Sequence, residues 1–328
     1  MAARQCLAVM VERNGGSDVL AVCPIEIADP GPGQIMVQLA AAGVNFIDVY
    51  QREGTYPIAT PFVLGSEGAG VVVQVGAEVT DFSVGDVVAW AHHRGSFSTL
   101  VVLPAEVAVP VPDGLDPELA AAVMLQGLTA HYLVNSTYAV QPGDRILMHA
   151  AAGGVGQLLT QLAKAKGASV IGTVSTDAKA AKARAAGADH VINYSEVSDV
   201  AAAVRELTAG EGVAVVYDGV GKQTFEASLK SLRIRGMLAL FGAASGQVPP
   251  FDLQRLNGLG SLFVTRPTLA HYVLTREELL WRSAEILGAV ADGSLRVEIG
   301  GRYSFADAAR AYDDLESRRT TGKLLLIP

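Results

Sequence analysis

A turn of small residues at positions 150–156 constrains the fold of this chain more than any other stretch. Residues 146–148 ahead of it are apolar, as in a strand that is buried on both faces. After it, apolar residues recur at the spacing of one helix face, at Val155, Leu158, Leu159, Leu162 and Ala163. We therefore predict a strand, a tight turn and a helix that ends at Gly167.

The turn has the spacing Ala151-x-Gly153-x-x-Gly156, a dinucleotide-binding pattern with Ala in place of its first Gly. Small residues let the backbone approach a pyrophosphate, whose charge the N-terminus of the following helix stabilises. Small residues also occur wherever a helix crosses a strand closely, so the motif alone leaves a purely structural role open.

Composition limits the classes of protein that this chain can belong to. A length of 328 residues suggests two domains, and half of the residues are hydrophobic. The net charge of −8 argues against a nucleic-acid-binding protein, although a local basic patch stays open. Two cysteines, Cys6 and Cys23, fit a reducing compartment. Without a run of about 18 apolar residues or a signal peptide, we expect no membrane span and a cytoplasmic location.

The pattern of predicted secondary structure changes near residue 121. Before it, short apolar runs between turn signals indicate a barrel-like β fold. After it, strands and helices alternate, which predicts a doubly wound parallel sheet. The predicted strands are 146–149, 169–174, 190–193, 213–217, 236–242 and 261–265, and the predicted helices are 155–166, 177–186, 197–208 and 222–232.

The last 63 or so residues are too short for a domain of their own. They show helices at 275–291 and 304–317 and a final strand at 323–327. We expect this tail to fold back onto the first segment. The predicted domains are therefore 1–121 with 266–328, β-rich, and 122–265, an α/β nucleotide-binding domain.

The residue that ends the second strand of such a sheet selects the nucleotide. Strand 169–174 ends without a carboxylate, and Asp177 fits an N-cap or first-turn position of the next helix. Lys179 in that turn can pair with the 2′-phosphate of NADP, although a solvated surface lysine fits its spacing equally well.

A second loop, Gly65-Ser66-Glu67, sits where a His at its centre would suggest a zinc ligand. Here the central residue is Ser66, and the upstream partner position holds Asn45. The neighbours His92 and His93 fit a loop better than a metal site, and His149 fits a hydrogen-bonded core position. We therefore expect no metal and polarisation of the substrate by hydrogen bonds.

Several motifs of this sequence, taken together, resemble those of one known family. They are Gly43-Val44-Asn45-Phe46-Ile47-Asp48, Gly65-Ser66-Glu67-Gly68-Ala69-Gly70, Gln126-Gly127-Leu128-Thr129-Ala130, residues 149–156, Asp218-Gly219-Val220-Gly221 and Val264-Thr265-Arg266-Pro267. In order and over nearly the whole chain, they resemble the zinc-free, zeta-crystallin-like quinone oxidoreductases of the medium-chain dehydrogenase/reductase superfamily. The resemblance implies a GroES-like catalytic domain, a Rossmann domain, NADPH as cofactor and quinones as acceptors. Bacterial members often carry Lys where this chain has Gln126, which leaves its quinone preference open.

The resemblance also implies roles for individual residues. The implied cofactor-binding residues are Thr129, Gly153, Gly154, Val155, Thr173, Ser175, Lys179, Tyr194, Phe241, Gly242, Val264, Arg266 and Arg318. The implied substrate-cleft residues are Asn45, Tyr50, Tyr56 and Gln126. Arg318 also fits a surface arginine at the end of a helix. Tyr50 and Tyr56 also fit ordinary packing at a domain interface.

These expectations describe an enzyme that transfers a hydride from NADPH to a quinone. Asn45 or Gln126 donates a hydrogen bond to the developing oxyanion, and water can supply the proton. Reduction of activated C=C bonds in enals or enones is the alternative within enzymes. An RNA-binding or structural role, as in some zeta-crystallin-like proteins, is the alternative outside them.

The strand at 261–265 closes the predicted sheet with three apolar residues, Leu262, Phe263 and Val264. An apolar edge is a poor surface to leave in water, so we expect a homodimer that pairs two such edges. Cover of the edge by residues 246–260 or by the tail is the alternative within one chain.

Overall fold

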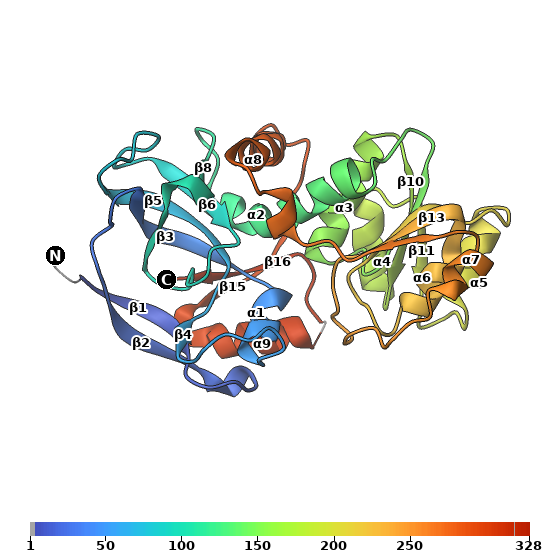
Figure 1. Ribbon diagram of the computed structural model, residues 1–328, viewed down its shortest axis with the longest axis horizontal. Helices are drawn as coiled ribbons and strands as arrows, with labels where there is room; N and C mark the ends of the chain where they lie inside the picture. Colours follow the sequence, from blue (N-terminus) through green and yellow to red (C-terminus); the bar gives the residue numbers. More distant parts are fainter. Residues whose placement is uncertain (1–3, 318) are drawn as a thin grey trace. The chain divides into compact units, whose positions relative to one another are not determined.

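The computed structural model describes residues 4–317 and 319–328, and these residues form two compact units (Figure 1). The first unit combines residues 1–128 with 273–328, and the second comprises residues 129–272. The boundary at 128/129 lies inside helix α2 (Pro117–Tyr132). Our functional domain bounds, 121/122 and 265/266, stay a prediction.

The first unit is built on two sheets of mainly antiparallel strands. The larger has the order β15-β16-β3-β5-β6-β8, with β7 also paired to β3, and the smaller has the order β2-β1-β4. Their bounds are β1 (Arg4–Val11), β2 (Leu20–Ile27), β3 (Gln34–Val44), β4 (Phe62–Val63), β5 (Glu67–Val75), β6 (Val87–Ala91), β7 (Leu100–Pro104), β8 (Ala108–Pro110), β15 (Ile299–Ser304) and β16 (Lys323–Ile327).

Strand β16 lies inside this larger sheet, between β15 and β3. β16 pairs antiparallel with the end of β3, opposite residues 42–44, and its apolar residues join the core around Trp90 and Phe97. The strands β3 and β5 approach so closely that a Cβ at Gly70 would lie 2.1 Å from the carbonyl oxygen of Gln38. Only glycine is compatible with that approach.

The second unit is a six-stranded parallel sheet with the order β11-β10-β9-β12-β13-β14. This order is that of the doubly wound Rossmann fold. Figure 1 shows its strands in green to orange, flanked by helices. The bounds are β9 (Arg145–Met148), α3 (Gly154–Ala165), β10 (Ser169–Val174), α4 (Asp177–Ala185), β11 (His190–Asn193), α5 (Val200–Leu207), β12 (Val213–Asp218), α6 (Phe225–Ser231), β13 (Leu232–Leu240), α7 (Gln254–Gly258) and β14 (Phe263–Thr265). The predicted α/β fold class, with its GroES-like and Rossmann parts, is confirmed.

Some elements differ from the sequence-based expectation. Helix α1 (Phe46–Arg52) and strand β2 were not predicted, and α2 continues through Gly127 to Tyr132. At Gly127, α2 packs closely against α8 (Arg276–Ala291), since a Cβ there would lie 2.8 Å from the Ile286 side chain. The tail contributes α8, α9 (Ala308–Glu316) and β16, close to the predicted ranges.

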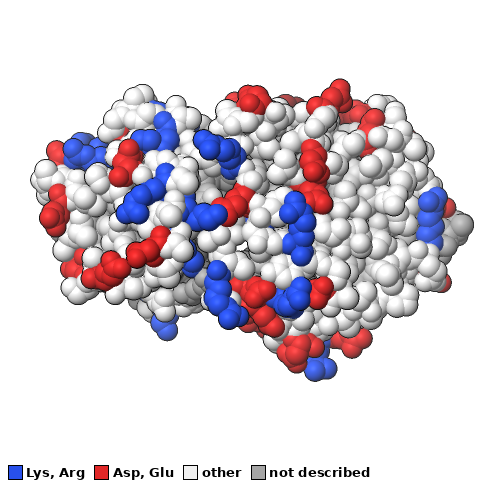
Figure 2. Space-filling model, turned by 180° about the vertical axis from the view of Figure 1, so that it is seen from behind, with Lys and Arg blue, Asp and Glu red and all other residues white. Residues whose placement is uncertain are grey.

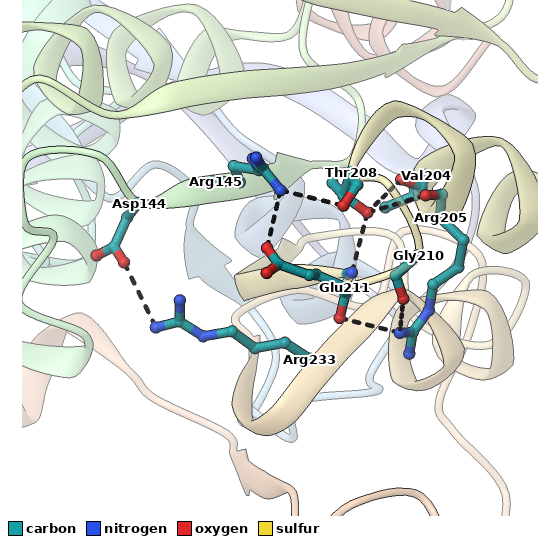
Figure 3. A network of polar contacts seen from close by, with 9 residues as sticks. Asp144, Arg145, Val204, Arg205, Thr208, Gly210, Glu211 and Arg233 are labelled. Carbon is teal, nitrogen blue, oxygen red and sulfur yellow. Dashed lines mark hydrogen bonds and ion pairs between the residues drawn. The ribbon is translucent and has the colours of Figure 1, made fainter.

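The amino ends of the parallel strands are fastened by side chains that bind backbone carbonyls (Figure 3). Arg205 donates to the carbonyl oxygens of Gly210, Glu211, Lys230 and Leu232, and Arg145 donates to that of Thr208. These carbonyls lie where helices α5 and α6 end and therefore lack partners within a helix. The opposite, carboxyl edge of the sheet carries the glycine turn.

Within the residues that the structure describes, we find no helix with the length and apolar character needed to cross a membrane.

Candidate functional site

The glycine turn lies between β9 and α3, as predicted. Gly153 caps α3 in an extended conformation and, having no side chain, makes no side-chain capping hydrogen bond to the first turn of the helix. A Cβ at Gly156 would lie 2.5 Å from the carbonyl oxygen of Ala150, so the turn closes only with glycine there. The N–H groups at the start of an α-helix attract anions. The turn with Gly153, Gly154 and Val155 therefore fits a dinucleotide pyrophosphate.

Three predicted cofactor residues lie together where β10 and β11 end. The Lys179 Nζ donates to the Ser175 Oγ at 3.4 Å, and the Tyr194 backbone N–H donates to the carbonyl of Val174 at 3.0 Å. Thr176 caps α4, so Asp177 is a first-turn residue. The end of β10 thus offers a hydroxyl and an ammonium group and carries no carboxylate that would repel a phosphate.

Two further predicted residues follow β13. The Phe241 N–H donates to the carbonyl of Asp218 at 2.9 Å. A Cβ at Gly242 would lie 2.4 Å from the carbonyl oxygen of Gly219, so these two loops touch through their backbones. Ligands of doubly wound sheets bind at this carboxyl edge.

The remaining predicted residues of the second unit are more scattered. Val264 lies in the edge strand β14, and Arg266 follows it and donates to the carbonyl of Pro267 at 3.4 Å. Thr173 is buried in β10 and Thr129 is buried in α2. Arg318 lies outside the described residues.

In the first unit, Asn45 caps α1 and is held on all sides. Its amide nitrogen donates to the carbonyl of Gly43 at 3.0 Å and to the Glu67 Oε1 at 2.7 Å. Its oxygen accepts from the Lys323 Nζ at 2.7 Å. An amide group has two hydrogens. Both are used here, so Asn45 has none to donate to a substrate in this arrangement.

Glu67 is a buried hub that the sequence reasoning did not assign to the site. Its Oε1 accepts from Asn45 and from the ammonium group of Lys323, and its Oε2 accepts from the Leu125 N–H at 2.6 Å. A Cβ at Gly43 would collide with this carboxylate. The one signal in the sequence was Lys323, a charge that opens an otherwise apolar strand. Because Leu125 precedes Gln126, the hub also fixes the turn of α2 that carries Gln126.

A second buried carboxylate, Asp48, lies beside this hub. It accepts from the Ser66 Oγ at 2.8 Å, the Tyr312 hydroxyl at 2.9 Å and the Asn45 N–H at 2.9 Å. Burial raises the pKa of Asp48 to about 6, against the opposing effect of these hydrogen bonds. Burial and the Asp48 carboxyl in turn raise the pKa of Tyr312 well above its usual value.

The two predicted cleft tyrosines contact each other. The rings of Tyr50 and Tyr56 lie edge to face with centroids 5.3 Å apart, and Tyr56 keeps 39 % of its surface exposed. Gln126 is half-buried in α2. Tyr50, Tyr56, Asn45 and Gln126 all belong to the first unit, where they present aromatic surface and one amide.

The histidine that directly precedes the glycine turn, His149, is bound within the core. His149 is buried with both ring nitrogens within hydrogen-bonding distance of hydroxyls, which confirms the expectation of a satisfied core residue. Among residues 4–317 and 319–328, no three His, Cys, Asp or Glu side chains are grouped so that they could hold a metal ion.

Two family models match the chain: an alcohol dehydrogenase GroES-like domain at residues 31–113 and a zinc-binding dehydrogenase at residues 154–279. A Pseudomonas aeruginosa quinone oxidoreductase is 50 % identical, over 96 % of this chain and 97 % of the relative. A Burkholderia 2-haloacrylate reductase is 42 % identical, over 98 % and 99 %. The crystal structure of Escherichia coli quinone oxidoreductase with NADPH superposes with a TM-score of 0.96 at 44 % identity, covering 98 % and 100 %.

Proposed function

Because this chain belongs to the quinone oxidoreductases of the medium-chain dehydrogenase/reductase superfamily, we propose that it reduces quinones with NADPH. The observation that carries the proposal is the 50 % identity to a quinone oxidoreductase over nearly the full length of both chains. The NADPH in the structure of the Escherichia coli relative supports the choice of cofactor.

NADPH supplies the hydride when it is bound. We propose that Gly153, Gly154 and Val155 hold its pyrophosphate, because their turn leaves helix N–H groups open to an anion. Its ribose 2′-phosphate is assigned to Ser175, Lys179 and Tyr194, which cluster in the structure. The remaining proposed cofactor contacts are Thr129, Thr173, Phe241, Gly242, Val264, Arg266 and Arg318.

On the quinone side, we propose that Gln126 donates the hydrogen bond to the developing oxyanion, since its amide, unlike that of Asn45, is not fixed by the buried hub. Tyr50 and Tyr56 supply aromatic surface for a flat substrate. Asn45 positions α1, which carries Tyr50. An amide does not release a proton near neutral pH, so water protonates the hydroquinone anion.

The proposed enzyme needs no metal and works in the cytoplasm as a homodimer. Asn45 and Ser66 stand where the superfamily pattern would need zinc ligands, and the Lys323 ammonium group already compensates the buried Glu67. The free cysteines Cys6 and Cys23 fit a reducing compartment. Cell fractionation tests the location, and a protein recovered outside the cytoplasm contradicts it.

Reduction of activated C=C bonds is the second candidate, favoured by the 42 % identity to a 2-haloacrylate reductase. Steady-state rates with a quinone panel and an enone panel, measured on one preparation with NADPH, separate the two. We expect higher kcat/KM for the quinones. A preparation that binds NADPH but reduces only enones removes our first choice.

An RNA-binding role has less support. The net charge is −8, and on the face seen in Figure 2 basic and acidic side chains are interspersed. Binding of RNA that weakens with salt and is displaced by NADPH would revive that role.

A further inference from the structure

A chain of buried polar side chains lies beneath the glycine turn of the second unit. The His149 Nδ1 is 2.9 Å from the Thr173 Oγ1, and its Nε2 is 3.0 Å from the Ser228 Oγ. The Ser228 Oγ is in turn 2.8 Å from the Asp218 Oδ2. All four side chains are at least 98 % buried. We call Thr173, His149, Ser228 and Asp218 the His149 chain.

The Asp218 carboxylate at one end of the His149 chain fixes the direction of its hydrogen bonds. A carboxylate only accepts hydrogen bonds, so the single Ser228 hydroxyl hydrogen goes to Asp218. Ser228 must then accept from His149, which places a hydrogen on Nε2. Burial, the larger effect, lowers the pKa of His149 against the opposing charge of Asp218, so the ring is neutral. Its Nδ1 therefore accepts from the Thr173 hydroxyl.

The chain joins three strand ends and one helix at the carboxyl edge of the sheet. His149 directly follows β9, Thr173 is the penultimate residue of β10, Asp218 ends β12 and Ser228 belongs to α6. A buried polar network in which every member is satisfied specifies one arrangement of the elements that carry it.

Each end of the His149 chain is also bonded to a loop of the candidate cofactor site. At one end, the Ala151 N–H of the glycine turn donates to the Thr173 carbonyl at 3.1 Å. At the other, the Asp218 Oδ1 accepts from the N–H groups of Val220 at 2.8 Å and Gly221 at 3.0 Å. The loop at 219–221 in turn touches Gly242.

We propose that His149 is a positioning residue for the dinucleotide: through Thr173 on one side and Ser228–Asp218 on the other, it sets the glycine turn against the loop at residues 219–221. This proposal rests on the proposed NADPH dependence. The pyrophosphate is common to NADPH and NADH, so loss of His149 weakens both cofactors alike.

The first test uses His149→Leu, which removes both hydrogen bonds, and His149→Gln, which can still donate to Ser228. Cofactor fluorescence titration should show NADPH and NADH dissociation constants raised about tenfold in the Leu variant, because two buried partners lose their hydrogen bonds. The Gln variant should recover most of that loss. Val204→Ala, which shortens a buried side chain of α5 that has no polar atom, is the control for lowered stability alone and should bind like wild type.

The second test reads the tautomer in the cofactor-free protein. In ¹⁵N NMR spectra of the imidazoles, the signals absent from His149→Gln belong to His149. We expect a hydrogen on Nε2, none on Nδ1 and a neutral ring at pH 7. A hydrogen on Nδ1 or a charged ring would overturn the direction of the chain. A Leu variant that is folded and binds both cofactors like wild type would overturn the positioning role. Wild-type protein that binds neither cofactor would instead refute the proposed function, while the NMR result stands by itself.

Discussion

At the residue scale, the role open to a polar side chain in this protein depends on how many of its hydrogen bonds are already made within the protein. Asn45 and Gln126 carry the same amide chemistry, yet both amide hydrogens of Asn45 are donated within the buried hub around Glu67. Lys179 and Lys323 carry the same ammonium group, yet Lys323 is buried against Glu67 and Lys179 is half-exposed beside Ser175.

Lys179 is predicted to discriminate between the two nicotinamide cofactors. Lys179→Ala should weaken NADPH binding by about 1.5–3 kcal/mol, because a charge-assisted contact to the 2′-phosphate is lost, and should leave NADH nearly unchanged. Dissociation constants for both cofactors measure this difference. Lys182→Ala on the exposed side of α4 is the matched control. Equal weakening of NADPH and NADH would show that Lys179 does not contact the phosphate.

Asp48 makes a prediction about pH and stability. Its pKa is raised from 3.8 to about 6 by burial, so the folded protein holds this proton more tightly than the unfolded chain does. The stabilisation from the protonated form is complete below about pH 4 and is lost as pH rises through 6. Asp48→Asn, which keeps a neutral group of the same shape, should therefore gain stability relative to wild type with rising pH, by up to about 3 kcal/mol. Denaturant unfolding at pH 4, 5, 6 and 7 checks this, and a difference that is constant with pH contradicts it.

At the element scale, β14 is the exposed edge of the parallel sheet. It pairs with β13 alone in the sheet order, and Phe263 and Val264 keep 56 % and 39 % of their surfaces exposed. Leu262, predicted to lie in this strand, precedes it and is buried in the core. The exposure of Phe263 argues against a cover over this edge by residues 246–260 of the same unit. An open apolar edge favours pairing with a second copy.

We predict that Phe263→Asp converts a dimer into a monomer, because it places a charge at the proposed two-fold contact. Sedimentation at micromolar concentration measures the mass of wild type and variant. Leu274→Asp, an equally drastic change at a residue that is 73 % exposed in the other unit, should leave the dimer intact. A monomeric wild type would contradict the proposed dimer, and a dimer that persists in Phe263→Asp would contradict the proposed contact surface.

At the scale of the whole molecule, we predict a metal content that differs from the one implied by the name of the family model matched at residues 154–279. That model describes zinc-binding dehydrogenases, whereas Asn45 and Ser66 stand at the two positions where zinc ligands would be expected, and neither residue is a usual zinc ligand. Elemental analysis of active protein purified without chelators should find no stoichiometric zinc, and a chelator should leave the rate unchanged. Loss of activity that zinc restores would refute a metal-free mechanism.

The sequence by itself determined the parallel sheet and the place of its nucleotide turn. Both rest on local signals, namely the spacing of the apolar residues and the small residues at fixed positions of the turn. The lack of a carboxylate at the end of strand β10 is a further local signal, which favours NADP over NAD. The residue motifs also identified the family, which the relatives confirm. Helix α1, with seven residues, escaped prediction because its pattern covers too few residues to stand out from the turns around it. Strand β2 has eight residues, but Pro24 interrupts its apolar run and argues against a strand.

Only the tertiary structure decided the contacts between residues far apart in the sequence. Glu67 meets Lys323 across 256 positions, and His149 meets Ser228 across 79. Neither pairing has a local signature, because a hydrogen bond depends on where two backbones bring their atoms and not on the spacing between them in the chain. For the same reason Asn45 read as a free donor in the sequence, although in the folded protein the Gly43 carbonyl and the Glu67 carboxylate accept both of its amide hydrogens.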